Sequence, residues 1–333
     1  MTVAVVILNW NGKHLLEQFL PSIVTYSSEA AIYVADNAST DDSINFIRSN
    51  YSDTVSIVKN KTNGGYAKGY NEALQHIKAN IYVLLNSDVE VTKNWLQPII
   101  AQFKSAPNTA IIQPKLLNYK KRSHFEYAGA AGGFIDFLGY PYCRGRIFMH
   151  LEEDQHQYDD IVPIFWASGA CLCIRSAIYN HLGGFDEDYF AHQEEIDLCW
   201  RVHNLGYDVH YVGTSAIYHV GGATLKEANP TKTFLNFRNS LYSIAKNIPK
   251  RYLFPVIMGR LILDAIAGVK FILELRPVHT LAIIKAHFSF YNNLKSMLQK
   301  RKESIAKTTH YFKCLSIVGQ HFILRRNTFT KIK

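Results

Sequence analysis

The N-terminal part of the chain alternates short apolar runs with amphipathic stretches, and this alternation limits the possible folds more than any other feature. Four apolar runs have the length of strands buried on both faces, at residues 3–8, 32–35, 55–58 and 81–85. Between the first two, apolar residues recur three and four apart over residues 15–24, and a second helix is predicted to begin at "TDDS". The pattern predicts an α/β fold with a doubly wound, mostly parallel sheet flanked by helices.

Polar loops leave the carboxyl ends of all four predicted strands, at residues 9–12, 36–40, 60–71 and 86–88. They are rich in Gly and Asn, and in a doubly wound sheet ligands bind beyond these strand ends. Taken alone, "NSD" (86–88) fits an ordinary turn, because Asn, Ser and Asp bond readily to nearby backbone. As one of four converging loops, it predicts a place for Asp88 in a nucleotide-binding site.

Two common nucleotide-binding motifs are absent from the sequence. No G-x-G-x-x-G follows the first predicted strand, and no G-x-x-x-x-G-K-[ST] occurs, which argues against dinucleotide-dependent oxidoreductases and P-loop enzymes. Residues 109–165 show no clear periodicity. Within them, "GAAGGF" and "YPYCRGR" predict flexible surface loops, and "HLEEDQHQYDD" predicts a solvated segment.

The charge of the chain is unevenly distributed. The net charge is +9, but residues 232–333 alone carry 19 Lys and Arg against 3 Asp and Glu, so the preceding part is acidic. The 5 cysteines are an odd number without C-x-x-C spacing, which predicts reduced thiols in a cytoplasmic protein. The N-terminal "MTVAVVILNW" lacks the basic region of a secretory signal and is predicted to be a strand.

A second group of polar residues lies near the middle of the chain. Glu194, Glu195 and Asp197 open a predicted helix just after the turn "GGFD". Acidic residues often stabilise a helix start through its dipole, and this structural role remains an alternative. His219 in "AIYHVGG" could likewise be an ordinary histidine.

The sequence resembles a family-two glycosyltransferase with the GT-A fold, particularly the rhamnosyltransferase-like branch of cell-surface polysaccharide synthesis. The resemblance covers about residues 3–240 and rests on motifs in the family's order: "VVILNWNG", "DNASTDDS", "NGGYAKGYNEA", "LLNSDVEV", "WASGAC", "GGFDEDYF", "EEIDLCWR", "YHVGG" and "FRN".

The resemblance implies a GT-A catalytic domain at residues 1–245. Residues 1–105 would mainly bind the nucleotide sugar, and residues 106–245 would mainly form the acceptor and catalytic half. Residues 246–333 would be a helical, amphipathic and basic extension. The implied reaction is a metal-assisted, inverting single displacement that moves a sugar from a nucleoside diphosphate to a glycan or lipid-linked glycan. Only the resemblance points to rhamnose.

The resemblance also assigns donor and metal residues. Asp88 matches the carboxylate of the family's D-x-D motif, with Asn86 in the first aspartate position, and His219 matches a further metal-associated position. Such a set would suit Mg²⁺ or Mn²⁺, which neutralises the departing diphosphate. The residues that would bind the donor are Asn9, Asn11, Asp36, Asn63, Gly65, Lys68, Asn86 and Asp88.

For catalysis, the resemblance points to the second member of an acidic pair. Here the pair is Glu194-Glu195, so Glu195 is the candidate base, Glu194 is the alternative, and Asp197 would support them. The residues that would bind the acceptor are Trp166, Ser168, Gly169, Gly184, Phe185 and Asp186. For Trp166 and Phe185, plain core packing is an equal alternative.

The basic tail contains an apolar stretch, residues 252–275, that includes Arg260, Asp264, Lys270 and Glu274. Four charges exclude a comfortable transmembrane span. They fall within a sector of roughly 120° on a helix, so an amphipathic helix is predicted. Together with the basic residues, it predicts peripheral attachment to the anionic inner face of the cell membrane. The alternatives are a helix packed on the catalytic domain and a homo-oligomer interface. No known nucleic-acid-binding motif accompanies the charge.

Two other functional classes remain open from the sequence. A nucleotidyltransferase on a similar sheet would release pyrophosphate instead of a nucleoside diphosphate. A non-catalytic protein that binds sugar nucleotides or surfaces would bind the donor without turnover.

Overall fold

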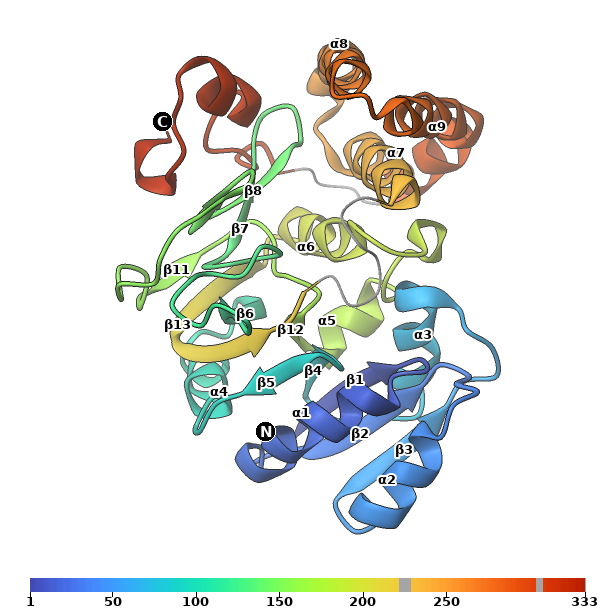
Figure 1. The fold of residues 1–333 in the computed structure, drawn as a ribbon, viewed down its shortest axis with the longest axis vertical. Helices are drawn as coiled ribbons and strands as arrows, with labels where there is room; N and C mark the ends of the chain where they lie inside the picture. Colours follow the sequence, from blue (N-terminus) through green and yellow to red (C-terminus); the bar gives the residue numbers. More distant parts are fainter. Residues whose placement is uncertain (222–228, 304–307, 333) are drawn as a thin grey trace.

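The computed structural model describes residues 1–221, 229–303 and 308–332, so Gly222 of the "YHVGG" motif lies outside the described residues. The N-terminal part alternates strands and helices, as predicted (Figure 1). Its elements are β1 (Val3–Asn9), α1 (Lys13–Tyr26), β2 (Ala31–Asp36), α2 (Ser43–Tyr51), β3 (Val55–Lys59), α3 (Gly65–Leu74), β4 (Ile81–Asn86), β5 (Val89–Val91) and α4 (Leu96–Ser105).

The four predicted strands are confirmed as the parallel part of the main sheet. β1 lies between β2 and β4, and β2 pairs with β3, all in parallel. The register places Asn9 beside Asp36 and Leu8 beside Asn86. Since the strands point the same way, the loops that follow them meet at one edge of the sheet.

The second half of the chain extends this sheet. Among the described residues, its strand order is β11-β13-β6-β12-β4-β1-β2-β3, with β5 paired to β13. β12 runs antiparallel between β4 and β6, whereas β13 is parallel to β6. The added elements are β6 (Thr109–Asn118), β11 (Ile161–Pro163), β12 (Cys171–Arg175), α5 (Ser176–His181), η1 (Glu187–Tyr189), α6 (Glu194–Asn204) and β13 (Asp208–His219).

The expectation of flexible surface loops within residues 109–165 is wrong. "GAAGGF" and most of "YPYCRGR" are buried and form a small antiparallel sheet. A side chain at Gly133 would collide with the Trp166 ring at 2.1 Å, so this glycine lets the indole pack against bare backbone. The strands of the small sheet are β7 (Gly133–Ile135), β8 (Pro141–Cys143), β9 (Arg146–Ile147) and β10 (His150–Leu151).

The acidic segment predicted to be solvated is partly engaged with buried cations. Asp154 accepts from the buried Lys115 Nζ at 2.9 Å. Asp160 receives both terminal nitrogens of the buried Arg144, at 2.7 and 2.8 Å. These paired charges fix the loop to the sheet, because a buried cation without its partner would be costly.

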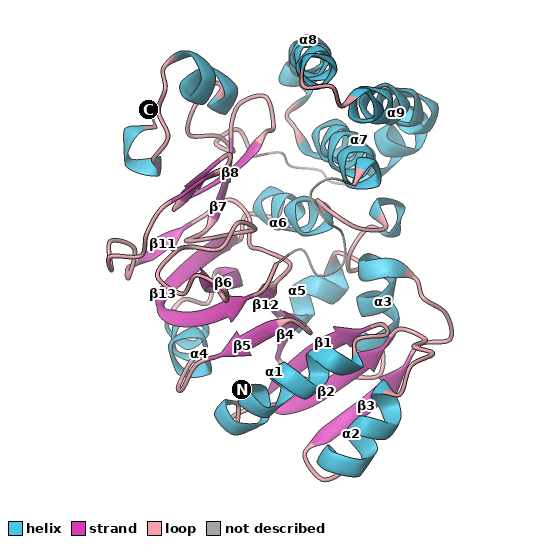
Figure 2. Cartoon of the chain, viewed as in Figure 1, coloured by secondary structure: helices cyan, strands magenta, loops and turns pink. Residues whose placement is uncertain are grey.

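The C-terminal part consists of α7 (Pro230–Asn247), α8 (Lys250–Leu273) and α9 (Pro277–Glu303), followed by short turns at Gly319–Ile323 and Phe329–Lys331. The helices gather beyond α6, away from the parallel strands (Figure 2). Tyr311, Cys314 and Ile317 of the tail are buried in the same core cluster as residues of β1. Within the described residues, none of the helices combines the length and the apolar character needed to cross a bilayer.

Asp197 joins α6 to α7 from a fully buried position. Its carboxylate accepts from Arg201 Nε at 2.8 Å, from Lys246 Nζ at 2.9 Å and from Asn247 Nδ2 at 2.7 Å. Burial opposes ionisation, but Lys246 and Arg201 hold the pKa of Asp197 below its ordinary value. The ionised carboxylate therefore stabilises the fold fully at pH values above the pKa that Asp197 has in the unfolded chain. This stabilisation is lost as the pH falls towards the lower pKa of the folded state.

We expect Asp197→Asn to lower the free energy of unfolding by about 3–5 kcal/mol at neutral pH, because Arg201 and Lys246 lose the buried carboxylate that they share. Urea unfolding followed by circular dichroism measures this difference. The matched control is Asp53→Asn on the surface, where a change within about 0.5 kcal/mol is expected. Equal stabilities of the two variants would contradict the role assigned to Asp197.

Candidate functional site

The loops after β1 and β2 hold each other through polar side chains. Asn9 Nδ2 donates to Ser39 Oγ at 3.2 Å and lies 3.5 Å from Asp36 Oδ1. Asn11 Oδ1 accepts from the backbone nitrogens of Thr40 and Asp41, at 2.7 and 3.2 Å. The structure therefore brings together Asn9, Asn11 and Asp36, all predicted donor residues, and Asn9 and Asp36 are buried.

Asn37 organises the next loop, and its role was missed from the sequence. Its Nδ2 donates to Asn63 Oδ1 at 2.9 Å and to the Gly65 carbonyl at 3.0 Å. Its Oδ1 accepts from Asn60 Nδ2 at 3.1 Å. The "DNAST" and "NKTNGG" motifs contain these residues, but nothing local in either indicates that they pair.

The start of α3 contacts the loop that precedes α6. Gly65 has a positive φ of 74°, and a side chain there would meet the Phe190 carbonyl at 2.7 Å. The next residue, Tyr66, donates its backbone N–H to that carbonyl at 3.1 Å. Lys68 is partly exposed one turn later and pairs with Glu72 at 3.6 Å. The predicted donor loop thus touches the segment that carries the acidic pair.

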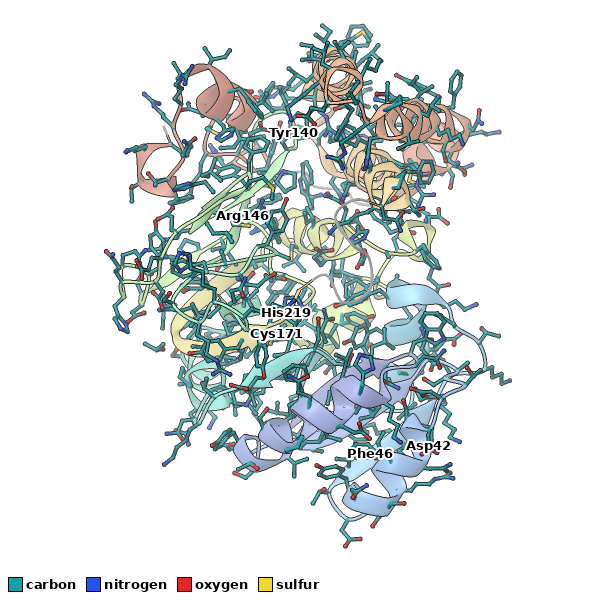
Figure 3. All side chains as sticks on the ribbon, viewed as in Figure 1. Asp42, Phe46, Tyr140, Arg146, Cys171 and His219 are labelled. Atoms are coloured by element: carbon teal, nitrogen blue, oxygen red, sulfur yellow. The ribbon has the colours of Figure 1, made fainter. Side chains whose placement is uncertain are left out.

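Asp88 and His219 come together although they are far apart in sequence. β5 and β13 are antiparallel, with Val89 beside His219, and this register brings His219 Nε2 to 3.2 Å from Asp88 Oδ1. His219 Nδ1 lies 3.4 Å from Glu126 Oε1, a buried carboxylate that the sequence analysis missed. Figure 3 shows His219 near the centre of the molecule. Asn86 is half-buried at the end of β4, where its backbone N–H donates to the Ala170 carbonyl.

The Asp88–His219 pair has the chemistry of a partial metal site. Burial opposes the charge on His219, but Glu126 and Asp88 raise its pKa to about 10, so the imidazole would have to release a proton before it could bind an ion. Two ligands of one ion in octahedral geometry at about 2.1 Å lie roughly 3 Å apart, which the Oδ1–Nε2 spacing fits. Within the described part of the chain, no group of three or more His, Cys, Asp or Glu side chains could hold an ion. Further ligands would therefore have to come from other groups.

Glu194 and Glu195 form an acidic pair at the first turn of α6, where Glu194 is buried and Glu195 is partly buried. One oxygen of each, Oε2, is buried without a hydrogen-bond partner. Burial raises the pKa of Glu195 to about 7, and burial with the charge of Glu195 raises the pKa of Glu194 well above its ordinary value. Burial and neighbouring charges, including both glutamates, also raise the pKa of Tyr66. A carboxylate that ionises near neutral pH, as Glu195 does, can accept a proton during a reaction.

Asp197, predicted to support this pair, faces the other way. Its partners are Arg201 on its own helix and Lys246 and Asn247 at the end of α7. It therefore anchors α6 in place.

The loop between η1 and α6 is strained and is held by Asn239. Phe190, His192 and Gln193 all have positive φ angles, of 62°, 68° and 73°, which cost energy for residues other than glycine. Asn239 Nδ2 points into this loop and donates to the carbonyls of Tyr189, Ala191 and His192, at 3.0, 2.9 and 2.7 Å. "FRN" contains Asn239, but the motif alone does not reveal these partners.

The predicted acceptor residues Trp166, Ser168 and Gly169 lie where the first and second halves of the chain pack together. Trp166 is buried and donates from Nε1 to the Phe134 carbonyl at 2.9 Å, so it packs in the core. Ser168 is also buried, and its backbone N–H donates to Gln113 Oε1 at 2.8 Å. The Gly169 carbonyl accepts from Tyr66 Oη at 2.8 Å, which ties this segment to α3.

The "GGFD" turn is fixed to α3 by Asn71, another residue missed from the sequence. Asn71 Oδ1 accepts from Phe185 N at 2.9 Å, and a side chain at Gly184 would meet that oxygen at 2.3 Å. Phe185 is buried against Tyr66, with ring centroids 5.5 Å apart. Asp186 is nearly buried between two lysines of the C-terminal helices, Lys246 and Lys300, each at 2.5 Å.

We expect Asn239→Ala to release the loop at residues 189–193 without unfolding the protein, because three carbonyls lose their shared donor and the positive φ angles relax. Hydrogen–deuterium exchange should become faster in peptides covering 189–195. Asn236→Ala, on the same helix but partly exposed, is the matched control. Unchanged hydrogen–deuterium exchange in Asn239→Ala would refute the proposed role of Asn239 in holding this loop.

Comparisons with known proteins identify the family and the fold. The family model described as "Glycosyltransferase like family 2" matches residues 1–233. The low-salt glycan biosynthesis hexosyltransferase Agl10 of Haloferax volcanii is 21% identical over 242 residues, which cover 71% of this chain and 73% of that protein. The N-acetylglucosaminyl-diphospho-decaprenol L-rhamnosyltransferase of Mycobacterium tuberculosis is 24% identical over 225 residues, covering 62% of this chain and 72% of that one.

Solved structures share the fold at low sequence identity. Residues 1–349 of S. aureus TarS, in complex with UDP-GlcNAc, align with a TM-score of 0.56 at 14% identity over 91% of this chain and 92% of that one. A mannosyltransferase from Pyrobaculum calidifontis, in complex with GDP-Man and Mn²⁺, aligns with a TM-score of 0.53 at 15% identity over 91% and 85%. These neighbours have the GT-A fold. Since the family model also matches well over half of the chain, the protein belongs to glycosyltransferase family 2.

Proposed function

We propose that this glycosyltransferase is inverting and transfers a sugar from a nucleoside diphosphate to a glycan or lipid-linked glycan in cell-surface polysaccharide synthesis. The observation that carries the proposal is the Glu194–Glu195 pair, which follows the loop that contacts the start of α3. Each glutamate keeps one buried carboxylate oxygen without a partner, and Glu195 ionises near neutral pH. These are the properties of a general base that faces a substrate hydroxyl.

In the proposed reaction, Glu195 accepts the proton of the acceptor hydroxyl as that oxygen attacks the anomeric carbon. The new C–O bond forms opposite the bond to the diphosphate, which breaks, so the configuration inverts and the nucleoside diphosphate leaves. Glu194 is the alternative base. Asn9, Asp36, Asn63 and Gly65 would hold the nucleotide, with Lys68 available to the phosphates.

Asp88 and His219 would hold a divalent cation, Mg²⁺ or Mn²⁺. The fit of their spacing to two ligands of one ion supports this role, as does the Mn²⁺ bound in the Pyrobaculum calidifontis mannosyltransferase. Asn86, diphosphate oxygens and water would complete the coordination. A bound cation would neutralise the diphosphate as a Lewis acid. Glu126 would orient His219 by accepting from Nδ1, as carboxylates do for metal-bound histidines.

We propose an L-rhamnosyl donor, a lipid-linked acceptor and a place on the cytoplasmic face of the membrane. The related M. tuberculosis protein is named as a rhamnosyltransferase acting on a diphospho-decaprenol substrate, which supports the first two. Most of the predicted acceptor residues are buried, so they would support the acceptor-binding surface from below. These residues are Trp166, Ser168, Gly169, Gly184, Phe185 and Asp186. Peripheral attachment would give access to a lipid-linked acceptor.

Donor binding should depend on Asp88 if this carboxylate holds the cation. In Asp88→Ala, addition of Mn²⁺ should no longer strengthen binding of a nucleoside diphosphate, measured by calorimetry, while thermal unfolding remains cooperative. Asp53→Ala on the surface serves as the control and should respond to Mn²⁺ like the unmodified protein. A normal Mn²⁺ response in Asp88→Ala would exclude the assignment.

Glu195→Gln should lower kcat by about 100- to 10,000-fold with nearly unchanged donor affinity, because the amide keeps the size of the side chain but cannot accept a proton. Turnover is measured as release of nucleoside diphosphate from candidate nucleotide sugars. A large loss in Glu194→Gln alone would assign the base to Glu194 instead.

The activity should fall as the pH drops below about 7, because burial raises the pKa of Glu195 and only the ionised form can accept the proton. In the limiting region, kcat/KM should decrease about tenfold per pH unit. A profile that is flat between pH 5 and 8 would rule out Glu195 as the base.

A further inference from the structure

The polar and apolar faces of α8 are reversed relative to those of an ordinary surface helix. Arg260 and Asp264 are only 1% and 0% exposed and form an ion pair at 3.2 Å. On the same helix, Phe254, Ile262 and Leu273 are 75%, 62% and 79% exposed. A helix on a soluble protein normally buries its apolar side.

Contacts to three other elements fix this orientation. Arg260 NH1 donates to Ser240 Oγ of α7 at 2.7 Å. Asp264 lies 3.0 Å from His287 Nε2 of α9 and accepts from Tyr140 Oη, in the connection between β7 and β8 of the small sheet. Tyr140 lies at the end of that sheet nearest the C-terminal helices (Figure 3). Rotating α8 to bury its apolar side would break all of these contacts and leave Asp136, which is also buried nearby, without the charge of Arg260.

The exposed apolar side chains of α8 form one continuous stripe. At 100° per residue they fall within a sector of roughly 140°, on the side opposite Arg260 and Asp264. α9 also exposes apolar residues three and four apart, and the connection between the helices exposes Leu275 at 90%. Figure 1 shows α8 and α9 at the edge of the molecule, with α7 on their inner side. The stripe consists of Phe254, Met258, Leu261, Ile262, Ile266, Val269, Ile272 and Leu273.

Exposed cations surround this stripe. They lie at the start of α8, at its connection to α9 and along α9, and they are Lys250, Arg251, Lys270, Arg276, Lys285 and Lys295. Few acids offset them, because residues 232–333 contain only three: Asp264 is buried, Glu274 pairs with Lys270 at 2.7 Å, and the third is Glu303.

We propose that the stripe of α8, with the α8–α9 connection, is a docking surface that inserts into the interface of an anionic lipid bilayer. An apolar face within a cationic rim matches such a surface, where both the headgroup charge and the acyl boundary contribute to binding. A second copy of the chain would bring the same cations against each other. The buried Arg260–Asp264 pair then serves to hold the apolar face outward. This inference deepens the membrane placement proposed above and does not depend on the identity of the donor or acceptor.

The test is co-sedimentation of the full-length protein with vesicles of phosphatidylcholine alone or mixed with phosphatidylglycerol. The unmodified protein should bind the mixed vesicles more tightly, and its binding should weaken with salt without vanishing, because insertion is not screened. Replacing both Ile262 and Ile266 by Gln should lower the partition coefficient at least about tenfold. The matched control replaces two exposed apolar residues elsewhere, Met149 and Ile161, and should bind like the unmodified protein.

Two further measurements distinguish loss of membrane docking from loss of activity and from dimer formation. Nucleoside diphosphate release in detergent-free solution should be the same in the Ile262→Gln/Ile266→Gln variant and the unmodified protein, so loss of the docking surface is distinguishable from loss of the activity. Equal partitioning of this variant and the unmodified protein would overturn the proposal. A concentration-dependent dimer in analytical ultracentrifugation that the variant abolishes would also overturn it, because the stripe would then be covered by a second copy.

Discussion

The buried carboxylate of Asp197 is the interaction on which the second half of the sheet domain depends. It fixes the first turn of α6 to the end of α7 through Lys246 and Asn247. Lys246 also pairs with Asp186 in the "GGFD" turn, so one ammonium connects α7 to both segments that flank the acidic pair. Each glutamate can keep one buried oxygen without a hydrogen bond because this neighbouring network, and not the glutamates themselves, holds the helix in place.

Asparagine side chains do much of the remaining positioning, and they do so through backbone groups. Asn37, Asn71 and Asn239 each join segments that are distant in sequence, and each presents both a donor and an acceptor. Such side chains can form hydrogen bonds with the backbone groups of loops, which have no partners in a helix or a sheet. This explains how left-handed residues such as Phe190 and Gln193 are tolerated next to the acidic pair.

The strands and polar loops of the N-terminal part could be predicted because continuous hydrophobicity is a local signal. The contacts of Asn71 with Phe185 and of Glu126 with His219 could not be predicted, since nothing in the sequence around Asn71 or Glu126 indicates the partner. The small sheet was misread for a different reason: Gly133 resembles a loop residue, whereas its missing side chain makes room for Trp166. For α8, periodicity separates the charged face from the apolar face, but only the contacts of Arg260 show which one meets the protein.

The packing of the tail has a consequence for biosynthesis. Ile317 and Val6 belong to the same core cluster, and the Ile317 backbone N–H donates to Asp136 Oδ2 at 2.8 Å. At about 5–20 residues per second, a ribosome needs roughly ten to forty seconds to travel from residue 136 to residue 317. During that time the tail that packs against the small sheet has not yet been synthesised. The nascent chain therefore exposes apolar surface until its last segment is made, which is the period when chaperones bind such surfaces.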